Sequence, residues 1–218
     1  MPHNEHYRHI LPHYQQPGQA YFMTWCLKNA IPPKALARYT KTLEELKAEI
    51  ESARKLKNNQ QLIVLLEQDY RSVRKQYMKA FDDLLHLQTE PFIDLSKPEY
   101  TNIIAEALLF FENDKVKNYA YCIMPNHVHW VFLTFEKDKE ELPVYVEDIM
   151  QSVKRHSAKK INDLENRKGA LWQKESFDKT IRDDKHLYRA IEYTLNNPVV
   201  AGLVKNREDW PGSWSGDF

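Results

Sequence analysis

Residues 117–135 hold two apolar, strand-like runs separated by a Pro-Asn pair, which favours a turn. Because so short a turn joins neighbouring antiparallel strands, this stretch constrains the fold more than any other part of the chain. The second strand begins with His127 and His129. Side chains alternate between the two faces of a strand, so both imidazoles project from one face, roughly 7 Å apart. The opposite face, which we expect in the core, holds Val128, Trp130 and Phe132.

Two imidazoles at this distance can chelate one divalent cation. The spacing alone leaves two interpretations open, because buried strand histidines with ordinary hydrogen-bond partners show it as well as metal ligands do. Whether His127 and His129 bind a metal therefore depends on which other residues could act as ligands to the same ion.

The remaining segments predict an α+β fold. Strands are expected over residues 20–27 and in the second half of 171–183, and helices over 96–114, 144–162 and 183–196. Ser96 is expected to cap the first of these helices, and Pro198 to stop the last one. The order of elements suits a ferredoxin-like antiparallel sheet backed by helices.

Residues 34–90 differ in character from the rest of the chain. They contain no Gly, and their apolar residues recur at helical spacing in two stripes separated by KLKNNQQ. We interpret the whole chain, residues 1–218, as one domain with a helical hairpin inserted at 34–90. A structural role for this hairpin is favoured over one in contacting DNA or a partner.

The composition bears on location and on binding. Cys26 and Cys122 lie in apolar runs, which favours two buried thiols in a reducing compartment. No membrane span or signal peptide is recognised, so we expect a cytoplasmic protein. The 31 Lys and Arg balance 31 Asp and Glu, but residues 151–190 hold eleven basic against six acidic residues. This stretch indicates either a phosphate-binding patch or a solvated helix face.

The last helix carries the second unusual pair. Its core face holds Leu187, Ala190, Ile191, Thr194 and Leu195. Tyr193 lies about 130° from the centre of that face, and Asn197 lies one turn further on, if the helix persists. A nucleophilic oxygen and an amide ligand one turn apart could serve one metal-bound phosphate, whereas the alternative is a surface tyrosine before a C-capping Asn.

These motifs resemble a known family. MPNHVH, the downstream tyrosine and NNPVVAGLV are similar to the single-tyrosine HUH transposases of bacterial insertion sequences, the transposase IS200-like superfamily. Within it, the chain looks closest to the REP-associated tyrosine transposases. The resemblance extends to RHILPHY, GQAYFMTWCL, SVKRHSAKKIN, LWQKESFDKTIRD and DWPGSW. It implies the ferredoxin-like palm of HUH endonucleases, although the hairpin at 34–90 exceeds what that compact fold requires.

The resemblance also implies an activity. The chain would nick and join single-stranded or hairpin DNA through a 5′-phosphotyrosine on Tyr193, with Mg²⁺ or Mn²⁺ held by His127, His129 and Asn197. Tyr188 is the rival nucleophile, but no Asn or Gln follows it four residues later. Candidates for DNA contacts are Arg8, Lys154, Arg155, Lys159, Lys160 and Arg182, together with Trp172, which could instead pack in the core.

Other readings remain open at this point. A non-catalytic regulator that binds hairpin DNA would keep the fold, and a histidine-metal hydrolase of small phosphoesters would keep the metal. The first leaves the complete His-His-Tyr-Asn set without a purpose, and the second leaves the tyrosine helix unexplained. The resemblance is compatible with a monomer or with a homodimer, in which the tyrosine helix can serve the partner's histidines.

Overall fold

The computed structural model describes residues 6–8, 12–14, 16–32, 34–56, 60–87 and 91–216, the first two ranges by their backbone alone. The chain divides into two compact units. The larger comprises Met1–Ala30 and Thr89–Phe218, and the smaller is Ile31–Gln88.

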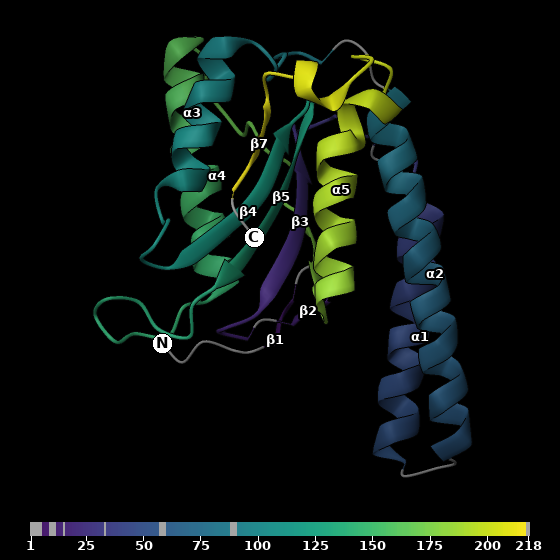
Figure 1. The fold of residues 1–218 in the computed structure, drawn as a ribbon. Coiled ribbons are helices and arrows are strands. Elements are labelled where there is room, and N and C mark those ends of the chain that lie inside the picture. The colour runs from purple at the N-terminus through teal and green to yellow at the C-terminus, as the bar shows by residue number, and fades with distance from the viewer. Residues whose placement is uncertain are drawn as a thin grey trace. The chain divides into compact units, whose positions relative to one another are not determined.

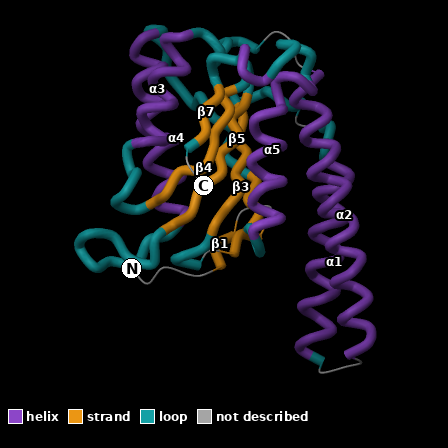
Figure 2. Tube along the Cα trace, in the orientation of Figure 1, coloured by secondary structure: helices purple, strands orange, loops and turns teal. Residues whose placement is uncertain are grey.

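The larger unit is built around a five-stranded antiparallel sheet (Figures 1 and 2). Its order is β6-β3-β5-β4-β7, with bounds β3 Ala20–Cys26, β4 Val116–Ile123, β5 His127–Thr134, β6 Phe177–Thr180 and β7 Ser213–Ser215. Without β7, the chain order of these strands across the sheet is fourth, first, third, second, which is the ferredoxin-like arrangement. A separate two-stranded ladder pairs β1 (His6–Arg8) with β2 (Pro12–Tyr14).

Helices cover both faces of this sheet. Figure 1 shows α3 (Pro98–Leu109) and α4 (Val146–Leu164) on one side and α5 (Asp184–Val200) on the other. Trp130 and Phe132 of β5 are fully buried, as the alternation of the strand predicts. On the opposite face, Val131 packs with Ala190 and Ile191 of α5. The predicted α+β fold is therefore confirmed, and the two histidines lie on the face that α5 covers.

The smaller unit is a pair of antiparallel helices, α1 (Ala37–Lys55) and α2 (Gln60–Leu87). The rings of Tyr39 and Tyr77 lie 6.1 Å apart, and Arg54 forms a 2.6 Å ion pair with Glu67. The first contact joins the start of α1 to the second half of α2, and the second joins the end of α1 to the first half of α2, as an antiparallel hairpin requires. The two helices predicted within residues 34–90 are thus present.

Two predicted helix ends are wrong. Ser96 does not cap α3, because its hydroxyl donates to Asp94 at 2.6 Å, and the N-cap is Lys97, followed by Pro98 at the first helical position. Pro198 does not stop α5, which continues to Val200. A proline here removes only the hydrogen bond of its own missing N–H, and the amide of Ala201 still donates to Asn197 at 2.9 Å.

The described helices include none that combines the length and the apolar character needed to cross a membrane.

Candidate active site

His127 and His129 are almost completely buried, with exposed fractions of 1% and 0%. Their ring centroids are 4.7 Å apart, and the two Nε2 atoms face each other at 3.0 Å. The backbone positions of two residues separated by one on a strand lie roughly 7 Å apart. The orientation of the two rings brings their Nε2 atoms much closer than that. The structure brings the two histidines together, as the sequence predicts.

The outer nitrogens of both rings have partners. His127 Nδ1 lies 2.6 Å from the Asn126 amide oxygen, which only accepts, so Nδ1 carries the hydrogen and Nε2 presents a lone pair. His129 Nδ1 lies 2.8 Å from the Thr24 hydroxyl, which can donate or accept. Such partners orient histidines that bind metals.

The two Nε2 atoms fit a divalent cation. An ion about 2.1 Å from each of two ligands at right angles places those ligands about 3.0 Å apart, which is the separation seen here. Within the described residues, no group of three or more His, Cys, Asp and Glu could hold a metal. Among the described residues, a candidate third ligand of another type is the amide oxygen of Asn197, which remains a proposal.

Two cysteines lie beside this pair in the sheet. Cys26 is opposite His127 in the strand register, and Cys122 is opposite His129. Burial raises the pKa of each thiol to about 12. Both thiols are therefore protonated at neutral pH and pack as small apolar side chains.

Tyr193 reaches the histidines from α5. Its ring lies 5.4 Å from that of His129, nearly perpendicular to it, and 5.6 Å from Phe22, which stacks on His129 from β3. Tyr193 is 40% exposed, so a substrate has access to it, whereas Asn197, one turn later, is 1% exposed. Asn197 belongs to the buried residues of α5, together with Ala190, Ile191 and Thr194.

Tyr188 lies elsewhere on the same helix. It is 59% exposed, and within the described part of the chain no ring contact joins it to His127 or His129. The packing therefore favours Tyr193 as the tyrosine of this site.

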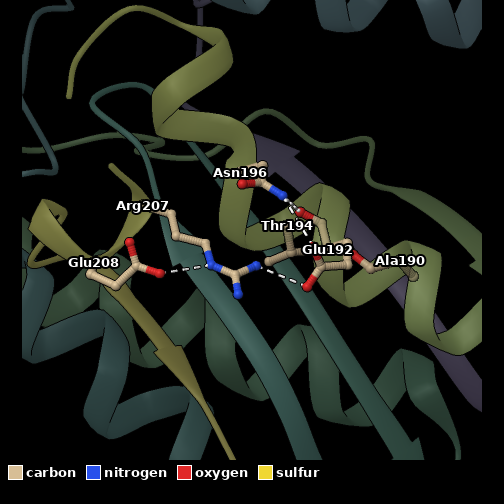
Figure 3. Close-up of polar contacts among 6 residues, drawn as sticks. All are labelled: Ala190, Glu192, Thr194, Asn196, Arg207 and Glu208. Carbon is tan, nitrogen blue, oxygen red and sulfur yellow. Dashed lines mark hydrogen bonds and ion pairs between the residues drawn. The ribbon is translucent and has the colours of Figure 1, made fainter. Parts of the chain in front are cut away.

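The segment that follows α5 forms hydrogen bonds with α5, the helix that carries Tyr193 (Figure 3). Arg207 donates to the Glu192 carboxylate at 2.8 Å and to Glu208 at 3.1 Å, and Asn196 donates to the Glu192 carbonyl at 2.9 Å. Further along, Trp210 donates to the carbonyl of Ile123, the last residue of β4, at 3.0 Å. The segment thus contacts both the helix that carries Tyr193 and the strand that precedes His127.

Four of the residues predicted to contact DNA are exposed on the surface. Arg155, Lys159 and Lys160 are exposed on α4, and Lys160 donates to Glu106 at 2.9 Å. Arg182 is exposed just before α5. Arg8 lies in β1, and its side chain is outside the described residues.

Lys154 and Trp172 have internal partners. The Lys154 amine donates to the carbonyls of Gln173 and Lys174 and to the Ser176 hydroxyl, at 2.8, 3.1 and 3.0 Å. Burial lowers the pKa of Lys154 to about 8. Trp172 is 6% exposed and donates to the Ser157 hydroxyl at 3.0 Å, which favours core packing over base stacking. These internal contacts favour a structural role for both side chains in holding the loop before β6.

Sequence reasoning missed three side chains of the site. Thr24 and Phe22 belong to β3, and only the strand register brings them beside His129 and Val131. Asn126 was interpreted as a turn residue alone, although it directly precedes His127. An amide side chain directly before a candidate metal-ligating histidine is the sequence signal that could have indicated Asn126.

Part of this chain is similar in sequence to a family of transposases. Residues 92–197 match the family model described as Transposase IS200 like, and this range contains both histidines, Tyr193 and Asn197. A Haemophilus influenzae protein named for the REP-associated tyrosine transposases is 30% identical over 99 residues, which make up 43% of this chain and 56% of that protein. The chain thus matches about half the length of this curated relative.

A solved structure supports the fold. A REP-associated tyrosine transposase bound to a REP hairpin matches over 97% of this chain and 91% of its own, with 16% sequence identity and a TM-score of 0.51. At this level of identity the likeness establishes the shared architecture.

Proposed function

Since residues 92–197 match the family model described as Transposase IS200 like, we propose that this chain nicks and joins single-stranded hairpin DNA through a covalent tyrosine intermediate. The observation that carries the proposal is the contact of the Tyr193 ring with His129, at 5.4 Å. It joins a nucleophilic side chain of α5 to a histidine pair whose facing nitrogens fit a divalent cation. The REP hairpin in the related solved structure supports hairpin DNA as the substrate.

The proposed reaction begins at the phenol oxygen of Tyr193. This oxygen attacks the scissile phosphorus, a new P–O bond forms, and the bond to the 3′ oxygen breaks. The phenol gives up its proton and the departing oxygen gains one, so the products are a 5′-phosphotyrosine and a 3′-hydroxyl. Because the phosphodiester energy is conserved in the tyrosine link, attack by a 3′-hydroxyl reverses the step and joins strands.

The other residues bind and orient. His127 and His129 would hold Mg²⁺ or Mn²⁺, with Asn197 as the third protein ligand. When bound, such an ion polarises the scissile phosphate and offsets the charge that develops on it. The amide of Asn197 would add a ligand without another negative charge near the phosphate. Arg155, Lys159, Lys160 and Arg182 are proposed to contact the DNA backbone.

The test is a search for a covalent adduct. Labelled single-stranded hairpin DNA is incubated with the protein and Mn²⁺ and analysed on a denaturing gel. We expect an adduct that is absent in Tyr193→Phe and strongly reduced in His127→Ala, whereas Tyr188→Phe serves as the matched control and keeps it. Hairpin binding without an adduct under either metal would favour a non-catalytic regulator. An adduct that is lost only in Tyr188→Phe would assign the reaction to that tyrosine.

A further inference from the structure

A second surface with the character of a binding site lies between α3 and α4. These helices enclose a cavity of about 330 Å³. Its apolar lining includes Ala107 and Val153, which are 5% and 1% exposed, and Phe111. The cavity lies in the helical layer on the opposite face of the sheet from His127 and His129, so the catalytic residues described above do not account for it.

An exposed aromatic ring borders this cavity. Phe110 is 76% exposed although Leu108, two residues earlier in α3, is fully buried. Its ring meets Phe111 edge-on, with centroids 4.9 Å apart, so most of its surface remains accessible to a stacking partner. An isolated exposed phenylalanine is unremarkable, but one beside a cavity with an apolar lining offers a platform for a flat ligand.

Polar groups complete the lining. Lys160 and Glu106 form a 2.9 Å ion pair there, and Ser152 and His156 are exposed next to it. These side chains offer hydrogen-bond donors and acceptors to the edge of a ring. Arg155 and Lys159, exposed on the same helix, add positive charge close by. The combination of aromatic platform, hydrogen-bonding edge and neighbouring cations matches what an unpaired nucleotide requires.

We propose that the cavity between α3 and α4 binds an unpaired base of the substrate DNA, with Phe110 as its stacking platform. This inference rests on the proposed function, since it presumes single-stranded DNA as substrate. The bound base would belong to the hairpin loop or to the strand beside the hairpin, away from the scissile phosphate. The polar and cationic lining favours a nucleotide over an apolar side chain from a second copy of the chain.

The experiment uses hairpin DNA with 2-aminopurine placed at one unpaired position at a time, in the loop and in the flanking strand. At one position, we expect the wild-type full chain to quench the fluorescence, because stacking on Phe110 quenches this base. Phe110→Ala should abolish that quenching and weaken binding roughly 10-fold. The slope of log K against log salt should not change, because no phosphate contact is lost.

Phe92→Ala is the matched control. Phe92 is 50% exposed in the same unit, but its ring is covered by the Arg167 guanidinium at 4.6 Å, so the variant should bind and quench like wild type. Since Phe110 is so exposed, its replacement should not prevent folding, which circular dichroism verifies.

The outcomes separate this inference from the proposed function. Failure of the wild-type chain to bind any hairpin would overturn both. Wild-type binding and tyrosine adduct formation, with unchanged quenching and affinity in Phe110→Ala, would overturn the base site alone. A dimer by light scattering that Phe110→Ala converts to a monomer, without any effect on quenching, would show that the surface is an interface between copies instead.

Discussion

The Nε2 atoms of His127 and His129 lie 3.0 Å apart, and the opposite nitrogen of each ring is held by a different side chain. Asn126 accepts from His127 Nδ1 and thereby directs the Nε2 lone pair toward His129. Thr24 can donate to His129 Nδ1 in the absence of a metal and accept from it when Nε2 is needed as a ligand. The site can therefore present both nitrogens to a cation without a change in net charge.

These outer contacts lead to a prediction about metal affinity. Asn126→Ala and Thr24→Val should each lower the affinity for Mn²⁺ by roughly 10- to 100-fold, because the histidine rings lose the partners that orient them. Isothermal titration calorimetry on the DNA-free protein measures this directly. Thr24→Ser keeps the hydroxyl and should stay close to wild type. Wild-type affinity in Thr24→Val would show that this hydroxyl does not orient His129.

Tyr193 packs against His129 of the same chain, so we expect the proposed site to be complete within one copy. Mixing Tyr193→Phe with His127→Ala should therefore give no covalent DNA adduct, since neither chain has a complete site. Denaturing gels with one variant enlarged by a tag reveal which chain carries any adduct. An adduct restored on the His127→Ala chain would mean that the tyrosine helix of one copy serves the histidines of another.

Local patterns were sufficient to predict much of this site. The Pro-Asn turn and the alternation of residues 127–132 predicted the hairpin and both faces of β5. The face to which a strand side chain points depends only on whether its position along the strand is odd or even. The position of Tyr193 followed from helical periodicity in the same way. The contribution of Thr24 did not, since it depends on the register between β3 and β5, which are separated by about a hundred residues of chain.

Tertiary packing decided the remaining positions. Pro198 has no amide hydrogen, yet it lies within α5 because the helix is close to its end and Pro198 is buried. Lys154 occupies a position that helical periodicity treats as outward, but the loop from Gln173 to Ser176 covers it and offers three acceptors. No single-sequence pattern indicates that a distant loop will fold over a lysine.

Lys154 should make stability depend on pH. Its pKa is lowered by burial from 10.5 to about 8 in the folded protein. Between these values the unfolded chain binds the extra proton, so the free energy of unfolding should rise with pH from about 8 to 10.5. Relative to Lys154→Met, we expect wild type to gain about 1–3 kcal/mol over this interval in urea unfolding. Equal pH dependence in both proteins would contradict the burial of a titrating amine.

Comparing Lys159→Met with Lys154→Met tests which of the two lysines contacts DNA phosphates. Lys159 is exposed on the same helix and is a proposed phosphate contact, so its loss should reduce the slope of log K against log salt for hairpin DNA by about 1. Lys154→Met should leave this slope unchanged, because the Lys154 amine binds the protein's own carbonyls. A reduced slope in Lys154→Met would return that residue to the DNA-binding set.

The segment after α5 approaches β4 so closely that only glycine fits at position 212. A Cβ on Gly212 would lie 2.5 Å from the Ile123 carbonyl oxygen and 2.8 Å from Trp210 Nε1. The Gly212 carbonyl accepts a hydrogen bond from the Ile123 amide at 2.8 Å, so the segment cannot move away from β4 without losing that bond.

Gly212→Ala should therefore lower the free energy of unfolding by about 1–3 kcal/mol in urea titrations. Ser213→Ala, which removes only a weak 3.4 Å contact with Cys122, should change it by about 0.5 kcal/mol or less. If Gly212→Ala were as stable as wild type, the segment could move off β4 at no cost, and its contact with Ile123 would not help to hold the strand that leads into His127.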